Sequence, residues 1–502
     1  MADQEPCFLL KLPVELKQEI ALHIERDDDL CAFRRTCRDV YDAIDMNVAS
    51  FWRRRFMSRF ESPSWDDGHM DRIQVNTKYK DVYQRRRKAM LYGATFSQRS
   101  LAIAKDKALV IRKAINFLET LRDLMTDSFS GKSTSDDGTV YGSANMQAIR
   151  QLFINFDILH FVLQPERNLN INFGRTTRSN KQAMMLTIPT DLLQTVQVML
   201  APALLSLNYH HIINNHFDFP TSQEYAYGMT ADDTYKIFTG VNGMDVNMTW
   251  VLQNLNFWKY HLTRQAELTL WSAYKDLEDA GKPRFWSQQL QNGKIDLGKN
   301  WKGSYAYVDR PVIDQIRRGE GHEKIIQDEF NGDHHDAFQA LRFETVHPDE
   351  EMIWPEIFER HLHSLSQPQQ NRAKTRAQHR SASPNSLPPH QRTSFQFRGA
   401  GQDAEEDFEA LGWINALPSQ QGIPGWQRMT MMKYYWIDVE TGVIDEEALW
   451  AYEGVVLPGG KVVVGRWWCT SDGVGEDMYS GPFILWCVDE AGCEGGKEQM
   501  EA

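Results

Sequence analysis

The sequence predicts an α+β multidomain protein, in which helical regions precede a C-terminal antiparallel β-barrel-like domain. Over roughly the first 290 residues, apolar side chains recur at the three- and four-residue spacing of amphipathic helices. Beyond Lys294, short segments alternate bulky and polar residues, as strands do. A polar, basic and proline-rich segment at 364–393 interrupts this second part. Such a composition cannot repay the entropy of ordering, so we expect a disordered linker there.

Residues 8–60 are predicted to form a three-helix module. Pro13 suits the first turn of a helix, and aspartates 27–29 suit the start of the next one. The first helix carries an apolar stripe formed by Leu12, Leu16, Ile20 and Ile24. The second helix presents Leu30, Phe33, Cys37, Val40 and Ile44. The third places Val48, Phe51 and Trp52 before "RRRF". So small a module shares its apolar surface with a neighbour, either the following chain or another protein.

The spacing of apolar residues divides the remainder into a helical middle region at 70–290 and a β-rich region at 294–363 and 394–493. A hairpin is expected around the Pro-Gly-Gly turn at 458–460, because glycine supplies the positive φ that such turns need. The three valines at 462–464 are typical of a strand buried on both faces. A closed barrel would leave these short strands without an exposed edge. An open sandwich remains the alternative.

Composition excludes several classes of function. A net charge of −13 argues against a broad nucleic-acid-binding surface. No apolar run reaches the ~20 residues that span a bilayer, and the N-terminus lacks the pattern of a signal peptide. The 6 cysteines contain no CxxC pair, which indicates a reducing cytoplasmic or nuclear location. The run "RRRK" at 85–88 could serve as a nuclear address or be a solvated helix face.

The opening module resembles the F-box. The resemblance rests on the order Leu12-Pro13-x-Glu15-Leu16, Ile20, Leu30, Cys37-Arg38, Ile44 and Trp52, within the stretch from Leu9 to Phe56. The chain departs from the family where an aromatic often follows the Cys-Arg pair and Val40 stands instead. The continuation "FWRRRFMSRFE" and a C-terminal pattern that includes "GRWW" and "GPF" are similar to fungal F-box proteins.

The resemblance implies a non-catalytic subunit of an SCF-type cullin–RING ubiquitin ligase. The module would bind a Skp-type adaptor, and through it a cullin, while the C-terminal region recruits an unknown protein substrate. The adaptor-binding residues implied are Leu12, Pro13, Leu16, Ile20, Leu30, Cys37, Ile44, Phe51 and Trp52. The same side chains could instead hold the three helices together.

Two other functions remain open: a non-ligase scaffold that binds the adaptor alone, and a ligand-binding barrel that carries the F-box as a degradation handle. Tryptophans in the C-terminal region suggest a pocket, because small barrels can hold one ligand. Side chains that fill the barrel are the competing interpretation. The candidate substrate-binding residues are Trp450, Tyr452, Arg466 and Trp467.

We expect no catalytic motif and no metal-binding motif in this sequence. The segment "SGKST" lacks the glycine that a phosphate-binding loop requires five residues before its Gly-Lys pair. His210, His211 and His216 are the best metal candidates, but their spacing does not converge ligands on one helix face. We therefore expect no metal, no cofactor and no covalent chemistry.

Overall fold

The structure is a computed structural model of the whole chain. It describes residues 8–45, 51–66, 72–95, 106–130, 142–154, 190–207, 219–228, 232–293, 297–320, 325–330, 337–347, 350, 354–362, 394–403, 406–438, 440–471 and 478–489. The chain divides into two compact units, one at 1–158 with 185–188 and the other at 159–184 with 189–502. The expected helical middle region at 70–290 is therefore shared between the two units. Among the described residues, no helix combines the length and apolar character needed to cross a bilayer.

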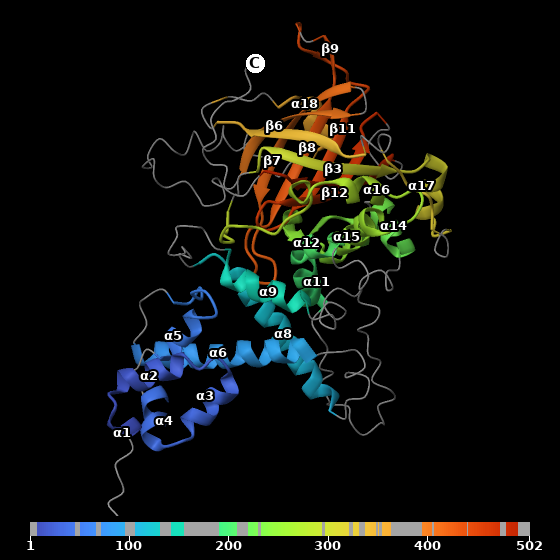
Figure 1. Ribbon diagram of the computed structural model, residues 1–502. Helices are drawn as coiled ribbons and strands as arrows, with labels where there is room; N and C mark the ends of the chain where they lie inside the picture. The colour runs from blue at the N-terminus through green and yellow to red at the C-terminus, as the bar shows by residue number, and fades with distance from the viewer. Residues whose placement is uncertain are drawn as a thin grey trace, which may run out of the picture. The chain divides into compact units, whose positions relative to one another are not determined.

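The described part of the first unit is helical (Figure 1). Its helices are α1 (Phe8–Lys11), α2 (Val14–Leu22), α3 (Asp27–Arg34), α4 (Arg38–Asp45), α5 (Phe51–Met57), α6 (Arg72–Thr95), α8 (Lys107–Thr126) and α9 (Ala144–Ile154). Helix α5 packs against α6, and α6 packs against α8 and α9. Buried aromatic residues of α5, α6 and the turn after α5 form the centre of this packing: Phe51, Trp52, Phe56, Phe60, Tyr79 and Tyr83.

The described residues of the opening module form five short helices where the sequence predicts three. The predicted second helix is broken between Arg34 and Arg38 into α3 and α4. At this break the hydroxyl of Thr36 donates a hydrogen bond to the carbonyl of Phe33 at 2.8 Å. A threonine hydroxyl that bonds the nearby backbone competes with helix continuation. The apolar period alone does not reveal the interruption, because Leu30, Val40 and Ile44 are buried on both sides of it.

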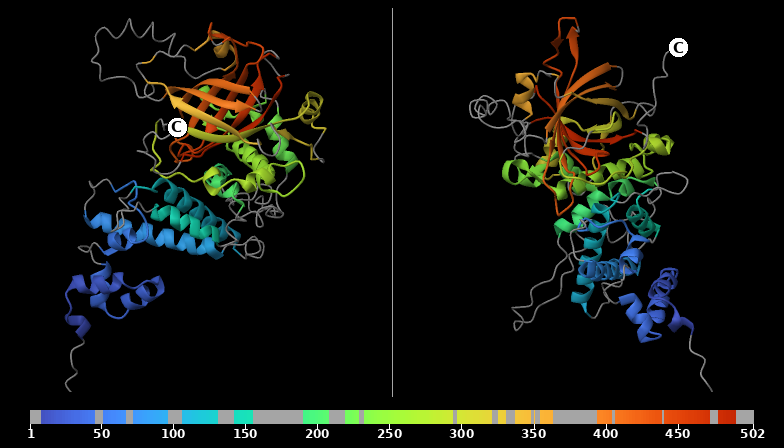
Figure 2. Two further views of the ribbon diagram at one scale, coloured as in Figure 1. Left: turned by 45° about the horizontal axis from the view of Figure 1, so that its top comes forward. Right: turned by 90° about the vertical axis from the view of Figure 1, so that its left-hand side faces the viewer.

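The second unit contains a closed antiparallel barrel of eight strands, drawn mainly in yellow, orange and red in Figures 1 and 2. Around the barrel the strands follow the order β13-β12-β11-β8-β7-β6-β5-β3, and β3 pairs with β13 to close it. The barrel strands are β3 (Asn300–Tyr307), β5 (Gln339–Thr345), β6 (Ser394–Asp403), β7 (Glu406–Ala416), β8 (Gln427–Tyr434), β11 (Trp450–Val456), β12 (Val462–Cys469) and β13 (Ser480–Cys487). The prediction of a barrel is confirmed, and the open sandwich is excluded.

Short strands and helices complete this unit. The strands are β1 (Phe238–Thr239), β2 (Asp245–Val246), β4 (Glu329–Phe330), β9 (Trp436–Asp438) and β10 (Val443–Ile444). The α-helices are α11 (Thr190–Met199), α12 (Ala201–Leu204), α14 (Phe219–Tyr227), α15 (Met248–Thr263), α16 (Trp271–Asp276), α17 (Arg310–Arg317) and α18 (Glu356–His361). Single 3-10 turns are η3 (Asp233–Tyr235), η4 (Val241–Gly243) and η5 (Asp279–Gly281).

Alternate residues of each strand fill the barrel. The interior cluster includes Phe343, Phe397 and Phe483, with Met429 and Met431 from β8. The other face of β8 and β11 packs against Phe358 and Leu362 at α18, through Met432, Tyr434 and Ala451. Helices α14 and α15 lie against β13 and β12. Because both faces are covered, Val462, Val463 and Val464 are all buried, as their sequence predicts.

Glycines allow the aromatic interior to close. A Cβ atom added at Gly465 would lie 2.3 Å from the carbonyl oxygen of Glu453 and 2.4 Å from the ring of Phe483. A Cβ atom at Gly412 would lie 2.3 Å from the ring of Phe397. The large rings therefore occupy the space that side chains would take at these positions.

The expected hairpin is present: β11 pairs with β12 from Trp450↔Cys469 to Val456↔Val463, with Gly459 and Gly460 at positive φ in the turn. Strand β7 was not predicted, because Leu411 and Trp413 on its outer face obscure the alternation of Phe408, Ala410 and Ile414. The predicted linker at 364–393 lies outside the described residues.

Candidate functional site

Helix α2 has an inverted distribution of polarity. Its side chains Leu16 and Ile20 are 50% and 41% exposed, whereas Lys17 and Gln18 are 4% and 6% exposed. The ammonium of Lys17 forms an ion pair with Asp39, and the amide of Gln18 donates to the carbonyl of Ala43 at 2.8 Å. Helix α4 thus holds the polar side of α2 inward. The exposed apolar side chains of this helix, Leu16 and Ile20, lie one turn apart, and we call them the α2 face.

A buried arginine fixes the loop that follows α2. The guanidinium of Arg55, on α5, donates to the carbonyls of Ile24 at 2.7 Å and Glu25 at 3.1 Å. It also forms an ion pair with Asp27 at 3.1 Å, and Asp27 accepts a hydrogen bond from Tyr83 at 2.7 Å. This network ties the end of α2 to α5 and α6, so the α2 face belongs to a rigidly supported helix.

The charge of Asp27 is stabilised by this network. Burial alone would raise the pKa of its carboxyl group, but hydrogen bonds from Tyr83, Arg87 and Arg55 outweigh burial and lower the pKa to about 2. The acidic start of α3 therefore does more than favour a helix N-terminus. In the sequence, the buried arginine of this network is the third arginine of "RRRF", Arg55.

The structure separates the implied adaptor-binding residues into two groups. Pro13, Leu16 and Ile20 are exposed, and Leu12 and Cys37 are half-buried. The second group is buried in the first unit and consists of Leu30, Ile44, Phe51 and Trp52.

The side chains of the buried group pack internally, as the alternative that they hold the helices together expects, and their part in adaptor binding stays a prediction. The indole of Trp52 donates to Asp45 at 3.0 Å and lies against Tyr83 of α6, with ring centroids 5.8 Å apart. Part of the cover of this tryptophan comes from a distant helix. The spacing of apolar residues in the sequence therefore could not predict that Trp52 is buried.

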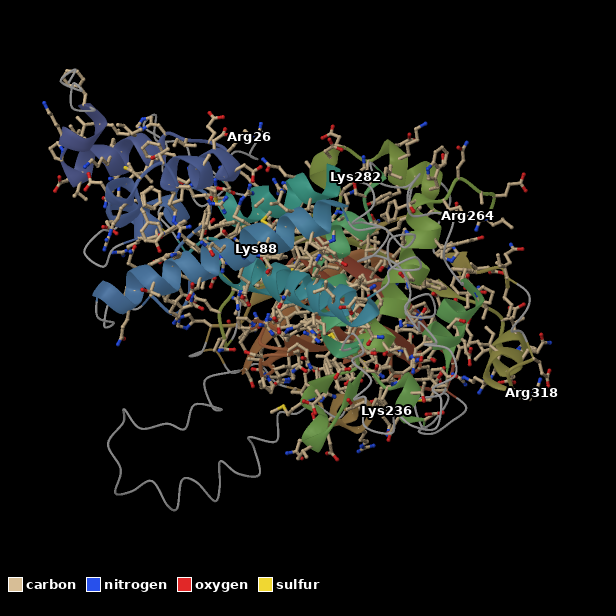
Figure 3. All side chains as sticks on the ribbon, turned by 90° about the horizontal axis from the view of Figure 1, so that it is seen from below. Arg26, Lys88, Lys236, Arg264, Lys282 and Arg318 are labelled. Atoms are coloured by element: carbon tan, nitrogen blue, oxygen red, sulfur yellow. The ribbon has the colours of Figure 1, made fainter. Side chains whose placement is uncertain are left out.

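The run "RRRK" at 85–88 is not a uniformly solvated face. Arg86 is buried, pairs with Asp127 at 2.5 Å and lies over the ring of Phe56, 5.1 Å from its centroid. Arg87 pairs with Asp27 at 2.7 Å. Lys88, labelled in Figure 3, is exposed. Two of these four cations therefore contribute to the packing of the first unit rather than to a basic patch.

A second candidate site lies at one end of the barrel. Half-buried aromatic side chains of β3, of β11 and of the residues flanking β8 and β13 gather there against the interior cluster. We call this set the barrel mouth: Tyr305, Tyr307, Tyr435, Trp450 and Tyr479. Lys433 is 3% exposed and places its ammonium 5.7 Å from the ring centroid of Tyr305 and 5.4 Å from that of Tyr435.

The four candidate substrate-binding residues do not form one site. Trp450 belongs to the barrel mouth, and Trp467 is buried beneath it, with their ring centroids 5.4 Å apart. Tyr452 lies deeper and contacts Phe483 at 5.1 Å between ring centroids. Arg466 points to the opposite face of β12, because neighbouring strand residues alternate sides.

Arg466 was therefore wrongly grouped with these aromatic residues. Its guanidinium is buried over the ring of Trp250, 5.8 Å from the centroid, and donates to the carbonyls of Tyr225 at 3.2 Å and Ala226 at 3.5 Å. Burial, reinforced by the charge of Arg317 and opposed by that of Glu453, lowers its pKa to about 9. Arg466 attaches α14 to the barrel wall.

Sequence reasoning did not single out Lys433, Tyr305 or Tyr479. A signal for Lys433 was present: it follows Met429 and Met431 at two-residue intervals, so it continues the inward face of β8. The described residues hold no group of three or more potential metal ligands. His210, His211 and His216 lie outside the described residues.

The fold and sites define an α+β protein with a helical N-terminal unit and a closed β-barrel. Comparisons with protein-family models, curated proteins and solved structures found no match to this chain.

Proposed function

We propose that this chain is a non-catalytic, substrate-recognition subunit of an SCF-type cullin–RING ubiquitin ligase. Its opening helices would bind a Skp-type adaptor. The single observation that carries this proposal is the inversion of α2, which exposes Leu16 and Ile20 while burying Lys17 and Gln18. A helix that buries its polar side is oriented for association through its apolar side.

The F-box resemblance and the exposure of side chains agree in part. Pro13, Leu16 and Ile20 belong to the resemblance and are exposed. Phe8 of α1 and Val14 at the start of α2 are also exposed, at 76% and 49%. Complete burial of a leucine or isoleucine contributes about 1.5–3 kcal/mol, so the half-exposed Leu16 and Ile20 would each contribute roughly half of that on docking.

The second unit would present the substrate. In this mechanism the chain holds a substrate lysine near a ubiquitin-charged enzyme carried elsewhere on the complex, which raises the effective concentration of the reacting groups. The barrel supplies a rigid support for recognition, because its strands are paired on both sides. No residue of this chain would take part in covalent chemistry.

The test measures binding of the full-length protein to a purified Skp-type adaptor by isothermal titration calorimetry. The double variant Leu16→Glu/Ile20→Glu changes two exposed side chains and should weaken binding at least 100-fold, because charges would be buried in an apolar contact. The matched control is Leu91→Glu/Leu109→Glu, which alters exposed leucines of α6 and α8 in the same unit. It should change the affinity less than threefold.

Loss of binding in both double variants, or in neither, would refute the assignment of the α2 face. Circular dichroism and thermal melting establish that each variant is folded. Wild-type protein that fails to bind the adaptor would remove the ligase proposal. Adaptor binding without recruitment of a cullin to the same complex would favour the non-ligase scaffold instead.

A further inference from the structure

Strands β9 and β10 form a two-stranded ribbon of their own in the second unit. Among the described strands they pair only with each other, and they extend past the end of the barrel strands in Figures 1 and 2. The paired residues are Asp438↔Val443 and Trp436↔Ile444, so Ile437 is an extra residue, as in a β-bulge. Each of the two strands therefore keeps one edge that no described strand covers.

The two faces of this ribbon have different surroundings. Trp436 and Ile444 are half-buried and pack against the cluster at α18, where the ring centroids of Trp436 and Tyr434 are 5.3 Å apart. Ile437 and Val443 are 67% and 47% exposed. Because successive strand residues point to opposite sides, these two β-branched side chains lie on the side away from the cluster. We call Ile437 and Val443 the open face of the ribbon.

Hydrogen bonds order the ribbon without a partner. The carboxylate of Asp438 accepts from the hydroxyl of Thr441 at 2.7 Å and from the backbone N–H of Glu440 at 2.9 Å. These hydrogen bonds lower the pKa of Asp438, so this carboxyl group is charged at neutral pH. Where β10 ends, the backbone N–H of Asp445 donates to the carbonyl of Tyr435 at 2.9 Å. A surface that is already ordered loses little entropy when a partner binds to it.

The ribbon and its flanks carry only negative charges. Asp438, Glu440, Glu446 and Glu447 are exposed, and residues 434–460 contain no lysine or arginine. Within the part of the chain that the structure describes, no cation pairs with the three glutamates. Like charge would repel a second copy of the ribbon, a nucleic acid or an anionic lipid surface. The charge instead complements a cationic protein segment.

We propose that the open face of the ribbon binds an extended protein segment in which apolar residues alternate with lysine or arginine. The apolar side chains of the partner would cover Ile437 and Val443, and its cations would approach Glu440, Glu446 and Glu447. An extended segment fits because both strands have an uncovered edge to which another strand can be added. The ribbon lies wholly within the second unit, so this proposal does not depend on adaptor binding by the α2 face.

The experiment measures binding of fluorescein-labelled synthetic peptides to the full-length protein by fluorescence anisotropy. The probe is the peptide KLRVKLRV. In the peptide KSRSKSRS serine replaces each apolar residue, and in ELEVELEV the charge is reversed. The probe should bind roughly tenfold more tightly than KSRSKSRS, because only the probe covers the open face, and ELEVELEV should not bind. The affinity for the probe should fall as sodium chloride is raised from about 50 mM to about 500 mM.

One pair of variants tests the apolar contact. Ile437→Ser/Val443→Ser should weaken binding of KLRVKLRV roughly to the level of KSRSKSRS, and should leave binding of KSRSKSRS unchanged. The matched control is Val241→Ser/Leu268→Ser, which changes apolar side chains that are 81% and 61% exposed elsewhere in the same unit. This control should bind each peptide as the wild type does.

A second pair of variants tests the charge. The test variant replaces the exposed glutamates of the ribbon and its flank: Glu440→Gln/Glu446→Gln/Glu447→Gln. It should weaken binding of both cationic peptides roughly fivefold and reduce the dependence on salt. The control removes as many exposed carboxylates elsewhere in the same unit: Glu267→Gln/Asp276→Asn/Glu278→Gln. It changes the net charge by the same amount and should alter either affinity by less than about twofold.

A further variant asks whether a basic segment of this chain occupies the ribbon. The four cations of "NRAKTRAQHR" at 371–380, which lie outside the described residues, are replaced by glutamine. This variant should bind KLRVKLRV as the wild type does. Binding that appears only in this variant would assign the ribbon to the chain's own segment and overturn the proposal of a separate partner.

The proposal is also overturned if the wild type does not bind KLRVKLRV, or binds KSRSKSRS equally well. The charges and the bulge would then serve only to protect the uncovered edges of the ribbon. Equal loss of binding in the ribbon variants and their controls would indicate attraction to the net charge of the whole protein, and would refute the site. Circular dichroism establishes that each variant is folded. If Ile437→Ser/Val443→Ser does not fold, the glutamine variant and its control decide.

Discussion

At the residue scale, buried arginines organise both units. Arg55 joins the loop after α2 to α5 and α6, and Arg466 joins α14 to the barrel. Each is surrounded by backbone carbonyls or acidic groups from distant segments. A buried cation is stable only when such groups are supplied, so these contacts specify how the elements meet.

Asp27 predicts how the first unit responds to acid. Its pKa is about 2 in the folded chain and about 3.9 when unfolded, so its ion pairs stabilise the fold above pH ~4. This contribution is lost as the pH falls from about 4 to 2. Because Asp27 is partly exposed, solvent screening limits the contribution to about 1–2 kcal/mol.

Differential scanning calorimetry of the full-length protein and of Asp27→Asn measures this effect. The variant should melt at a lower temperature at pH 6, and the difference between the two proteins should diminish towards pH 2.5. Asp28→Asn is the control, because Asp28 is exposed and its 3.8 Å ion pair with Arg26 is at the surface. A difference for Asp27→Asn that stays constant over this pH range would contradict the assignment.

At the element scale, the pairing of β11, β12 and β13 depends on small residues. Gly465 on β12 faces Gly454 on β11 and Phe483 on β13 in the strand register. The ring of Phe483 lies over both glycines. The two glycines therefore leave room for one large interior side chain. Local β-propensity would not predict strands at these positions, because glycine disfavours strands.

We expect Gly465→Ala to destabilise the barrel by roughly 1–3 kcal/mol, the usual cost of overpacking a core. Gly281→Ala is the matched control, because a Cβ atom there would have no neighbour closer than 3.8 Å. In thermal unfolding, the melting temperature of Gly465→Ala should be lower than that of the wild type. The melting temperature of Gly281→Ala should be almost unchanged. Equal melting temperatures for the two variants would disprove the packing argument.

At the scale of the whole molecule, the barrel is closed by strands that lie far apart in the chain. β3 begins at Asn300, and its partner β13 ends at Cys487. Beyond β13, Asp489 accepts hydrogen bonds from the backbone and side-chain amides of Asn300 at 2.8 and 2.9 Å. The last described strand is therefore required to complete a sheet that begins almost 190 residues earlier.

A chain that ends at residue 477 should fail to close the barrel. Without β13, the edges of β3 and β12 would be exposed and would favour aggregation. A chain that ends at residue 489 retains β13 and Asp489, and should melt as the full-length protein does. Size-exclusion chromatography and melting curves distinguish the two. A monomeric, cooperatively melting 1–477 chain would show that β13 is dispensable.

Much of the architecture could be predicted from local patterns. The alternation in "WKGSYAYV" and "FQALRFETV" predicts strands where β3 and β5 lie, and the glycine turn predicts the β11–β12 hairpin. The stripe of Leu16 and Ile20 predicts the α2 face. The buried positions of Phe51, Trp52 and Arg86 could not be predicted, because the side chains that cover them come from distant segments.

The sequence by itself determined the order of helical and β-rich regions, the hairpin, and the apolar stripe of α2. It did so because these features depend on spacing within a few residues. Only the tertiary structure decided that α2 turns this stripe outward, that β3 meets β13, and that Lys433 stands among aromatic rings at the barrel mouth. Those outcomes depend on which distant groups satisfy a buried charge or cover an apolar surface, and local spacing carries no record of them.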